Sequence, residues 1–124
     1  MSYKVDKIKY DGMESLVTAV IVFDKNLIMN YINPSTETLF EVSAKQAVNN
    51  NISIFFEDTN NFFKNIIEKV DQQKNSYKEH EYFLQTHQKK TIRVSLTVSA
   101  LIDASEEFII EFIQMDHQLK VARE

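Results

Sequence analysis

A ten-residue stretch near the C-terminal end of the chain alternates strictly between apolar and polar side chains. Its polar positions hold Thr, Ser and Arg, and its apolar positions are Ile92, Val94, Leu96, Val98 and Ala100. Successive side chains of a strand point to opposite faces of a sheet, so one face of this stretch is expected to be buried and the other wet. The pattern therefore predicts an antiparallel sheet that is covered on one side.

Two segments nearer the N-terminus have the length and composition of a β-hairpin. Residues 19–24 and 27–33 are short and rich in β-branched side chains. At their junction, Asp24, Lys25 and Asn26 favour a turn, because Asp and Asn side chains bond to nearby backbone groups. We therefore expect two antiparallel strands joined by this turn.

Two further strands are expected on either side of the alternating one. Residues 77–86 show a weaker alternation, and Lys89 and Lys90 after them are expected in a solvated hairpin turn. Residues 108–115 carry apolar side chains on both faces. That pattern predicts a central strand or a strand covered by a helix.

The longest helix is expected between the second and third strands. Five apolar residues recur there with the period of an α-helix and would lie on one face. They are Phe62, Phe63, Ile66, Ile67 and Val70. We expect this helix to begin after Asp58 and Thr59 and to end in the polar residues 71–76.

Shorter helices are expected directly after the hairpin. Asn33 is a favoured N-cap, and Pro34 at the first helical position loses no useful N–H group. Ser43 and Gln46 have the spacing of a capping box, which predicts a second short helix. Periodicity alone leaves residues 52–58 open between a strand and a short helix.

An N-terminal helix is expected to begin at Asp11, because its spacing from Glu14 matches a capping box. Four apolar residues then fall on one helical face: Met13, Leu16, Val17 and Val20. This face is too apolar for a free helix, so we expect it to contribute to a homodimer. Packing on the chain's own sheet is the alternative.

The low content of glycine and proline indicates how many domains the chain forms. The 124 residues contain one of each, so no flexible linker divides the chain and we expect one domain. The element order predicts an α+β fold. In it, the short helices and one longer helix are inserted between strands 2 and 3 of a five-stranded antiparallel sheet, and a further helix flanks the N-terminus.

Charge and composition exclude several classes of function. The formal net charge of −4 provides no general electrostatic footprint for nucleic acid. The absence of Cys excludes disulfides, thiolate nucleophiles and Cys-ligated metals. No apolar run approaches the ~20 residues of a membrane span, and no signal-peptide stretch is present. We therefore expect a cytoplasmic protein that binds neither nucleic acid nor membrane.

The histidines and one pair of carboxylates are the remaining candidates for chemistry. His80 and His87 are seven residues apart and His117 is near the C-terminal end, so no convergent metal-ligand spacing results. Glu79 and Glu81 are expected on one solvated face of a strand. No nucleophile–base pair, Gly-rich phosphate loop or kinase signature occurs, so we expect no catalysis by this chain.

The element order and the segment NYINPSTETLFEVSAKQAVNNNISIFF together resemble the PAS fold. The segment is similar to that family's second strand, Asn-Pro helix cap and small-helix region, and the resemblance covers residues 11–118. PAS domains often carry Gly after the first short helix and near the second, where this chain has Glu41 and Asn49. Asn tolerates a left-handed backbone well, so the run from Asn49 to Asn51 is expected to replace Gly, and Glu41 is less suited to that role.

The PAS resemblance also implies what the interior holds. Relatives that bind haem place a His on the long helix, and relatives that bind flavin covalently use a Cys; this chain has neither, so no cofactor is expected. PAS folds often have a cavity between the long helix and the sheet. Its lining here would be Phe63, Ile67, Val94 and Leu96, so a ligand would be small and largely apolar.

The C-terminal segment IIEFIQMDHQLKVARE resembles the junction between the PAS domain and the kinase core of NtrB-type nitrogen-regulation sensor histidine kinases. The matching residues are Glu111, Met115, Asp116, Gln118 and Glu124. The resemblance implies an output joint at Asp116, Gln118 and Leu119, with Asp116 as the N-cap of the helix that follows. The expected divisions are an N-terminal tail over 1–10, a PAS domain over 11–116 and the start of a linker helix over 117–124.

This resemblance implies a signal-input and dimerisation domain of a two-component sensor histidine kinase. The kinase domain would lie beyond Glu124, and a response regulator and a PII-type protein would act mainly on it. A stand-alone small-molecule-binding PAS-like protein is the alternative. A small α+β enzyme would need a polar cluster in a pocket.

Overall fold

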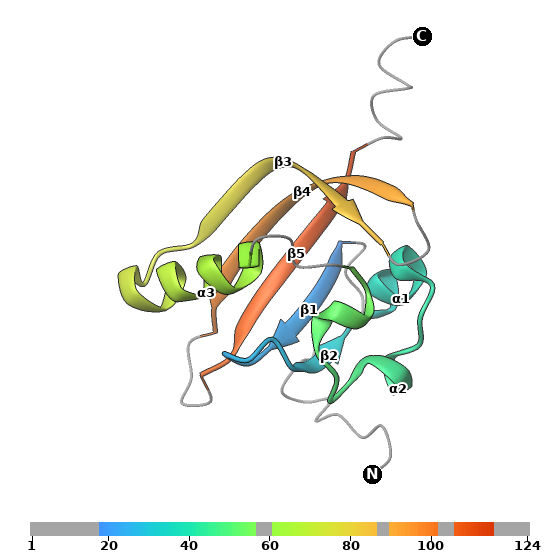
Figure 1. The fold of residues 1–124 in the computed structure, drawn as a ribbon, viewed down its shortest axis with the longest axis horizontal. Helices are drawn as coiled ribbons and strands as arrows, with labels where there is room; N and C mark the ends of the chain where they lie inside the picture. Colours follow the sequence, from blue (N-terminus) through green and yellow to red (C-terminus); the bar gives the residue numbers. More distant parts are fainter. Residues whose placement is uncertain (1–17, 57–60, 87–89, 102–105, 116–124) are drawn as a thin grey trace, which may run out of the picture.

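The computed structural model describes residues 18–56, 61–86, 90–101 and 106–115. They form a five-stranded antiparallel sheet with the strand order β2-β1-β5-β4-β3 (Figure 1). The strands are β1 (Ala19–Phe23), β2 (Met29–Ile32), β3 (Tyr77–Gln85), β4 (Thr91–Ala100) and β5 (Phe108–Gln114). The α+β sheet expected from the sequence is confirmed.

Every described helix lies between β2 and β3 in the chain, as predicted (Figure 1). α1 packs on β1, α2 packs on β2, and α3 packs on β3 and β4. These elements are α1 (Pro34–Phe40), α2 (Ala44–Ala47), the 3-10 helix η1 (Ile52–Ile54) and α3 (Phe62–Gln73). The main core therefore lies between the helices and one face of the sheet, called the inner face below.

The alternating strand β4 supplies the centre of this core. Ile92, Val94, Leu96 and Val98 are buried on the inner face, as predicted. Ala100, the last residue of the strand, is exposed, so the expectation of burial was wrong there.

β5 is the central strand of the sheet and pairs with both β1 and β4. Its inner-face side chains Phe108, Ile110 and Phe112 are buried. On the outer face, Ile109 is half-buried, whereas Ile113 is 50% exposed. The prediction of a central strand from its two apolar faces is confirmed.

A second, smaller apolar cluster lies on the outer face of β1 and β2. Val20, Val22 and Tyr31 are fully or almost fully buried there, and Leu101 and Ile109 pack against them. The assignment of Val20 to an N-terminal helix was wrong, because the β-branched run from residue 19 to 23 pairs with strands on both sides. The other residues of the predicted dimer helix, and its capping pair, lie outside the described residues.

The long helix α3 buries the predicted stripe against the sheet. Its buried members are Phe63, Ile66, Ile67 and Val70. Phe62 is half-buried, and its ring stacks on Tyr82 of β3 at a centroid distance of 4.2 Å. The predicted start after residues 58 and 59 lies outside the described residues. The helix ends at Gln73, and Lys74 takes the left-handed backbone that closes it.

The short helices have the predicted caps. The side chain of Ser43 accepts a hydrogen bond from the N–H of Gln46, whose side chain reaches back to Ser43, so the capping box of α2 is confirmed. Of the stretch left open between strand and helix, Ile52–Ile54 form a 3-10 helix, and residues 57 and 58 lie outside the described residues. After this helix, Phe56 forms an isolated antiparallel bridge with Thr86 at the end of β3.

An irregularity in β3 changes the expected positions of two carboxylates. The register with β4 shifts between Glu79 and Tyr82. Glu79 therefore accepts from the Tyr77 hydroxyl on the inner side, whereas Glu81 reaches Arg93, which lies on the outer face. The expectation that Glu79 and Glu81 share a face was wrong, because the extra residue of a bulge reverses the alternation.

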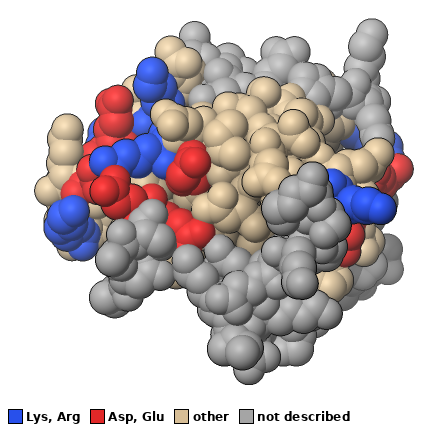
Figure 2. Space-filling view, turned by 90° about the horizontal axis from the view of Figure 1, so that it is seen from below, with Lys and Arg blue, Asp and Glu red and all other residues tan. Residues whose placement is uncertain are grey.

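Charged side chains of both signs lie next to each other on the face shown in Figure 2, with uncharged residues between the groups. Exposed ion pairs join Lys25 to Glu106 at 2.7 Å and Lys74 to Asp71 at 3.6 Å. Exposed pairs of this kind contribute little to stability.

Candidate functional site

Asn33 is a fully buried polar side chain that ties the first strand to the first helix. Its Oδ1 accepts from the N–H groups of Thr36 and Val20, both at 3.0 Å. Its Nδ2 donates to the carbonyl of Thr18 at 2.8 Å. The Thr36 hydroxyl lies 2.8 Å from Asn33 Oδ1 and 2.8 Å from the Val20 carbonyl oxygen. The predicted cap at Asn33 and Pro34 is confirmed, and it also fixes the start of β1.

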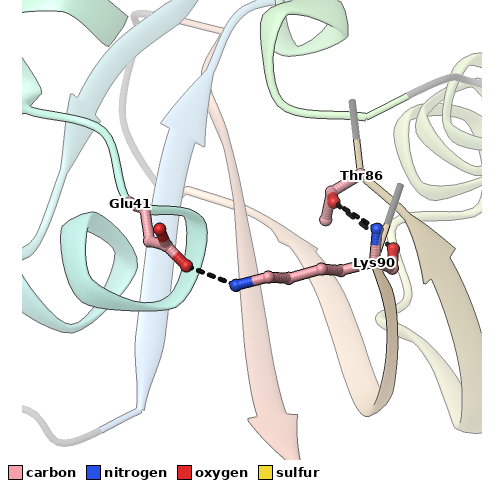
Figure 3. Close-up of polar contacts among 3 residues, drawn as sticks. All are labelled: Glu41, Thr86 and Lys90. Atoms are coloured by element: carbon pink, nitrogen blue, oxygen red, sulfur yellow. Dashed lines mark hydrogen bonds and ion pairs between the residues drawn. The ribbon is translucent and has the colours of Figure 1, made fainter. Parts of the chain in front are cut away.

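Both positions where PAS domains often carry Gly have a left-handed backbone in this chain. Asn49 has φ 74°, as expected, and Glu41 has φ 57°. Glu41 also pairs with Lys90 at 2.7 Å, and the backbone N–H of Lys90 donates to the Thr86 hydroxyl oxygen at 3.2 Å (Figure 3). This exposed ion pair joins the end of α1 to the β3–β4 hairpin.

The residues expected to line a cavity lie together in the main core. Phe63, Ile67, Val94 and Leu96 are each at most 4% exposed. Beside them, aromatic rings contact one another at centroid distances of 4.8 to 6.3 Å. These rings are Phe40, Phe55, Phe56, Phe63 and Phe112. Neither of the two surface grooves described next is lined by any of the four predicted residues.

The first groove, called the α1 groove, runs between α1 and the ends of β1 and β5. Its volume is about 280 Å³. The described residues that line it are Ala19, Ser35, Thr38, Leu39, Phe112 and Gln114. None of these carries a charge, and together they mix apolar surface with hydroxyl and amide groups.

The second groove, called the turn groove, lies beside the β1–β2 turn and has a volume of about 320 Å³. Its described lining residues are Lys25, Asn26, Leu27, Asn51, Asn61 and Lys64. The hydrogen bond and charge of Glu106 raise the pKa of Lys25 above its usual value. The cationic side of this groove is therefore partly neutralised already.

One phenol in the core rim has a strongly shifted pKa. The Tyr77 hydroxyl donates to Glu79 at 2.6 Å. That hydrogen bond, together with burial and the negative charge of Glu79, raises the pKa of Tyr77 to about 12. The pair is placed on the inner side of β3 and contacts neither groove.

Candidates for metal binding are not brought together in the part of the chain that the structure describes. His80 is exposed on β3, and His87 and His117 lie outside the described residues. Across residues 18–56, 61–86, 90–101 and 106–115, no three His, Asp or Glu side chains are placed to hold a metal ion.

The predicted output joint at Asp116, Gln118 and Leu119 lies just beyond the last described residue. Met115 is described, and its N–H donates to the Arg93 carbonyl at 3.0 Å. Pairing with β4 therefore continues to the residue that precedes the joint.

Sequence reasoning missed the α1 groove. The signal that could have pointed to it is Ala19, the one small side chain in the otherwise bulky strand AVIVF. Ala19 lies opposite Phe112 in the β1–β5 pair. The wall that α1 adds on the other side depends on how helix and sheet pack, which local periodicity does not specify.

Comparison with known proteins agrees with this architecture. A family model described as the PAS fold matches residues 11–115. The PAS domain of nitrogen regulation protein NR(II) from Vibrio parahaemolyticus is similar in structure, with TM-score 0.70 and 20% identity; 82% of this chain and 93% of that chain are covered. A PAS domain of a protein from Colwellia psychrerythraea has TM-score 0.71 and 15% identity, with 87% and 94% covered.

A PAS domain from a two-component sensor histidine kinase has TM-score 0.65 and 20% identity, and the match covers 87% of this chain and 94% of that one. No significant match was found among curated proteins. Of the helices in the described residues, none has both the length and the apolar content that crossing a membrane requires.

Proposed function

The chain belongs to the PAS family, and from that premise we propose that it is a signal-input and dimerisation domain of a two-component sensor histidine kinase acting in nitrogen regulation. The observation that carries this proposal is the position of β5. It is the central strand, it pairs with two neighbours, and it ends directly before the segment that resembles an output joint. A segment that continues from a central strand follows any movement of the sheet.

Similarity to solved structures supports the proposal at the level of the fold. The protein from Vibrio parahaemolyticus is a nitrogen regulation protein, and another neighbour is part of a two-component sensor histidine kinase. At 20% identity these likenesses do not carry a subfamily. The nitrogen-regulation proposal therefore rests on the C-terminal segment around Met115 and Asp116.

In this proposal the domain works in the cytoplasm as a homodimer and contains no catalytic groups of its own. Its apolar residues Met13, Leu16 and Val17 contribute to the dimer. The kinase domain follows in the same polypeptide, and a response regulator and a PII-type protein act on that domain. Light scattering should give a dimer mass at high micromolar concentration, and Leu16→Glu should shift it toward the monomer.

A stand-alone small-molecule-binding PAS protein is the second candidate, and the α1 groove favours it. The natural reading frame discriminates between the two. Continuation past Glu124 into a phosphoacceptor helix supports the kinase assignment, and a stop codon there supports the alternative.

The decisive experiment places Asp116→Ala in the full-length protein. An N-cap Asp accepts hydrogen bonds from the first turn of its helix, and its loss costs about 0.5–2 kcal/mol. We expect a changed balance of kinase and phosphatase output with an unchanged melting temperature of this domain. Unchanged output would remove Asp116 from the mechanism. The isolated chain should incorporate no labelled phosphate from ATP above a buffer blank.

A further inference from the structure

We propose that the α1 groove binds a small neutral molecule that has a short apolar tail and a hydrogen-bonding head. The expected effect of such binding on output rests on the proposed function above, whereas the binding itself does not. The groove lies on the surface beside α1, outside the aromatic cluster of the main core, so it is distinct from the cavity expected between α3 and the sheet.

The floor of the groove is apolar. Ala19 and Phe112 face each other across the β1–β5 pair, and both are nearly fully buried. The methyl group of Ala19 leaves room next to the Phe112 ring that a larger side chain would fill. Leu39, half-buried on α1, adds an apolar wall. An alkyl tail that displaces water from the half-buried Leu39 side chain gains hydrophobic free energy, while Ala19 and Phe112 close the groove beneath it.

The rim of the groove is polar but uncharged. Ser35 and Thr38 of α1 supply hydroxyl groups, and Gln114 of β5 supplies an amide. Gln114 lies opposite Val94 in the β4–β5 pair, which places it on the inner face toward α1. Among the described residues, the Gln114 side chain has no hydrogen-bond partner, so its amide can both donate to and accept from a ligand.

The described part of the lining is uncharged and therefore favours a neutral ligand. Moving a charged group from water to a site without a counter-charge is costly, whereas a neutral amide or alcohol can exchange its water contacts for the Gln114 amide and for the acceptor side of the Thr38 hydroxyl, whose proton goes to the Pro34 carbonyl at 3.3 Å. The described lining contains no Lys, Arg, Asp or Glu. The turn groove is lined by two lysines, of which Lys25 is paired with Glu106, and it serves as a charged internal comparison.

Size limits the ligand to a small molecule. A volume of about 280 Å³ equals the share of about nine liquid water molecules. Butyramide suits such a space, because its propyl group matches the apolar floor and its amide matches the rim. With so few atoms, its dissociation constant should be on the order of a millimolar.

The position of the groove connects it to the end of the domain. Gln114 directly precedes Met115, the last residue paired with β4, and the opposite wall belongs to α1. A ligand that bridges Gln114 and α1 holds the end of the central strand against the helix. In the full-length protein, it should therefore shift the output that the segment after Met115 controls.

The test follows backbone amide shifts of the purified chain during titration with butyramide, with sodium butyrate as a charged molecule of the same shape. We expect saturable shifts at Leu39 and Gln114 with butyramide, and at least about tenfold weaker effects there with butyrate. Equal binding of both compounds, or shifts that centre on Asn26 and Lys64 of the turn groove, would overturn the proposal. So would the absence of any saturable shift.

Two variants test the location. Thr38→Arg places a long side chain over the groove from an exposed helix position, so the fold should persist, and Ala19→Val fills the floor with a residue that suits a strand. Each should weaken butyramide binding at least about tenfold. Gln72→Arg, at an exposed position of α3 outside the groove, is the matched control and should bind like the parent. Undiminished binding to Thr38→Arg excludes the α1 groove.

Output is measured separately, in the full-length protein with and without butyramide. Binding without a change in output would support the binding site and refute its link to the proposed function. Loss of the output response in Thr38→Arg but not in Gln72→Arg supports both the binding site and its link to output.

Discussion

Replacing Asn33 with Ala should destabilise the domain far more than an ordinary helix cap does. The variant loses the cap of α1, which is worth about 1 kcal/mol. It also leaves the Val20 N–H without its side-chain acceptor in a fully buried position, which costs about 1–3 kcal/mol. The lost bond to the Thr18 carbonyl adds about 1 kcal/mol. We expect a total of about 3–5 kcal/mol, a large part of the 5–15 kcal/mol typical of a domain.

Urea unfolding followed by circular dichroism measures this loss. The matched control is Asn51→Ala, which removes the cap of η1 at a half-buried position, where its Oδ1 accepts from the Ser53 N–H at 2.9 Å. That change should cost about 1 kcal/mol or less, because water can replace the lost contacts. If the two variants lose equal stability, the argument that burial of the Asn33 network sets its energy is refuted.

Three further predictions concern single side chains. Glu41→Gly should raise the free energy of unfolding by up to about 1 kcal/mol, because it relieves a left-handed backbone; Glu41→Ala loses the same ion pair and keeps the Cβ, so it should give no gain in the same urea assay. Phe56→Ala should cost about 3–5 kcal/mol, since its ring contacts three other rings of the core. The pKa of Tyr77 is raised to about 12, so its bond to Glu79 stabilises the fold fully below the ordinary tyrosine pKa of about 10 and is lost as the pH rises through about 12. The difference in free energy of unfolding between the parent and Tyr77→Phe should therefore narrow over that pH range. Absorbance at 295 nm, which follows tyrosine ionisation, should show one phenol that ionises at a higher pH in the parent than in Glu79→Gln.

Local signals in the sequence were enough for most of the fold. The alternation from Ile92 to Val98 and the cap at Asn33 each act over a few residues, and the structure places both as expected. Val20 was assigned wrongly, because the same apolar residue fits a helical face and a β-branched strand. Pairing with β5, a strand about ninety residues later in the chain, decided the outcome.

Features that depend on tertiary contacts were not predictable in this way. The bulge in β3 separates Glu79 from Glu81 although the local sequence shows no Gly or Pro there. Glu41 has a left-handed backbone, which is intrinsically unfavourable for a residue with a Cβ atom. It is the C-cap of α1, where packing fixes the path that the chain takes after the helix. Local propensity is a weak prior at such positions, because packing of distant segments overrides it.

One corner of the domain combines the buried network and the α1 groove. Asn33 holds the backbone at Thr18 and Val20, at the start of β1, while Ser35 on the next turn of α1 lines the groove with Gln114 at the end of β5. β1 and β5 are neighbours in the sheet (Figure 1), and the start of β1 lies beside the end of β5, with Ala19 opposite Phe112. Close-packed elements of this kind shift between discrete arrangements rather than deform gradually. A change in how α1 packs on the sheet is therefore expected to affect the start of β1 and the end of β5 together.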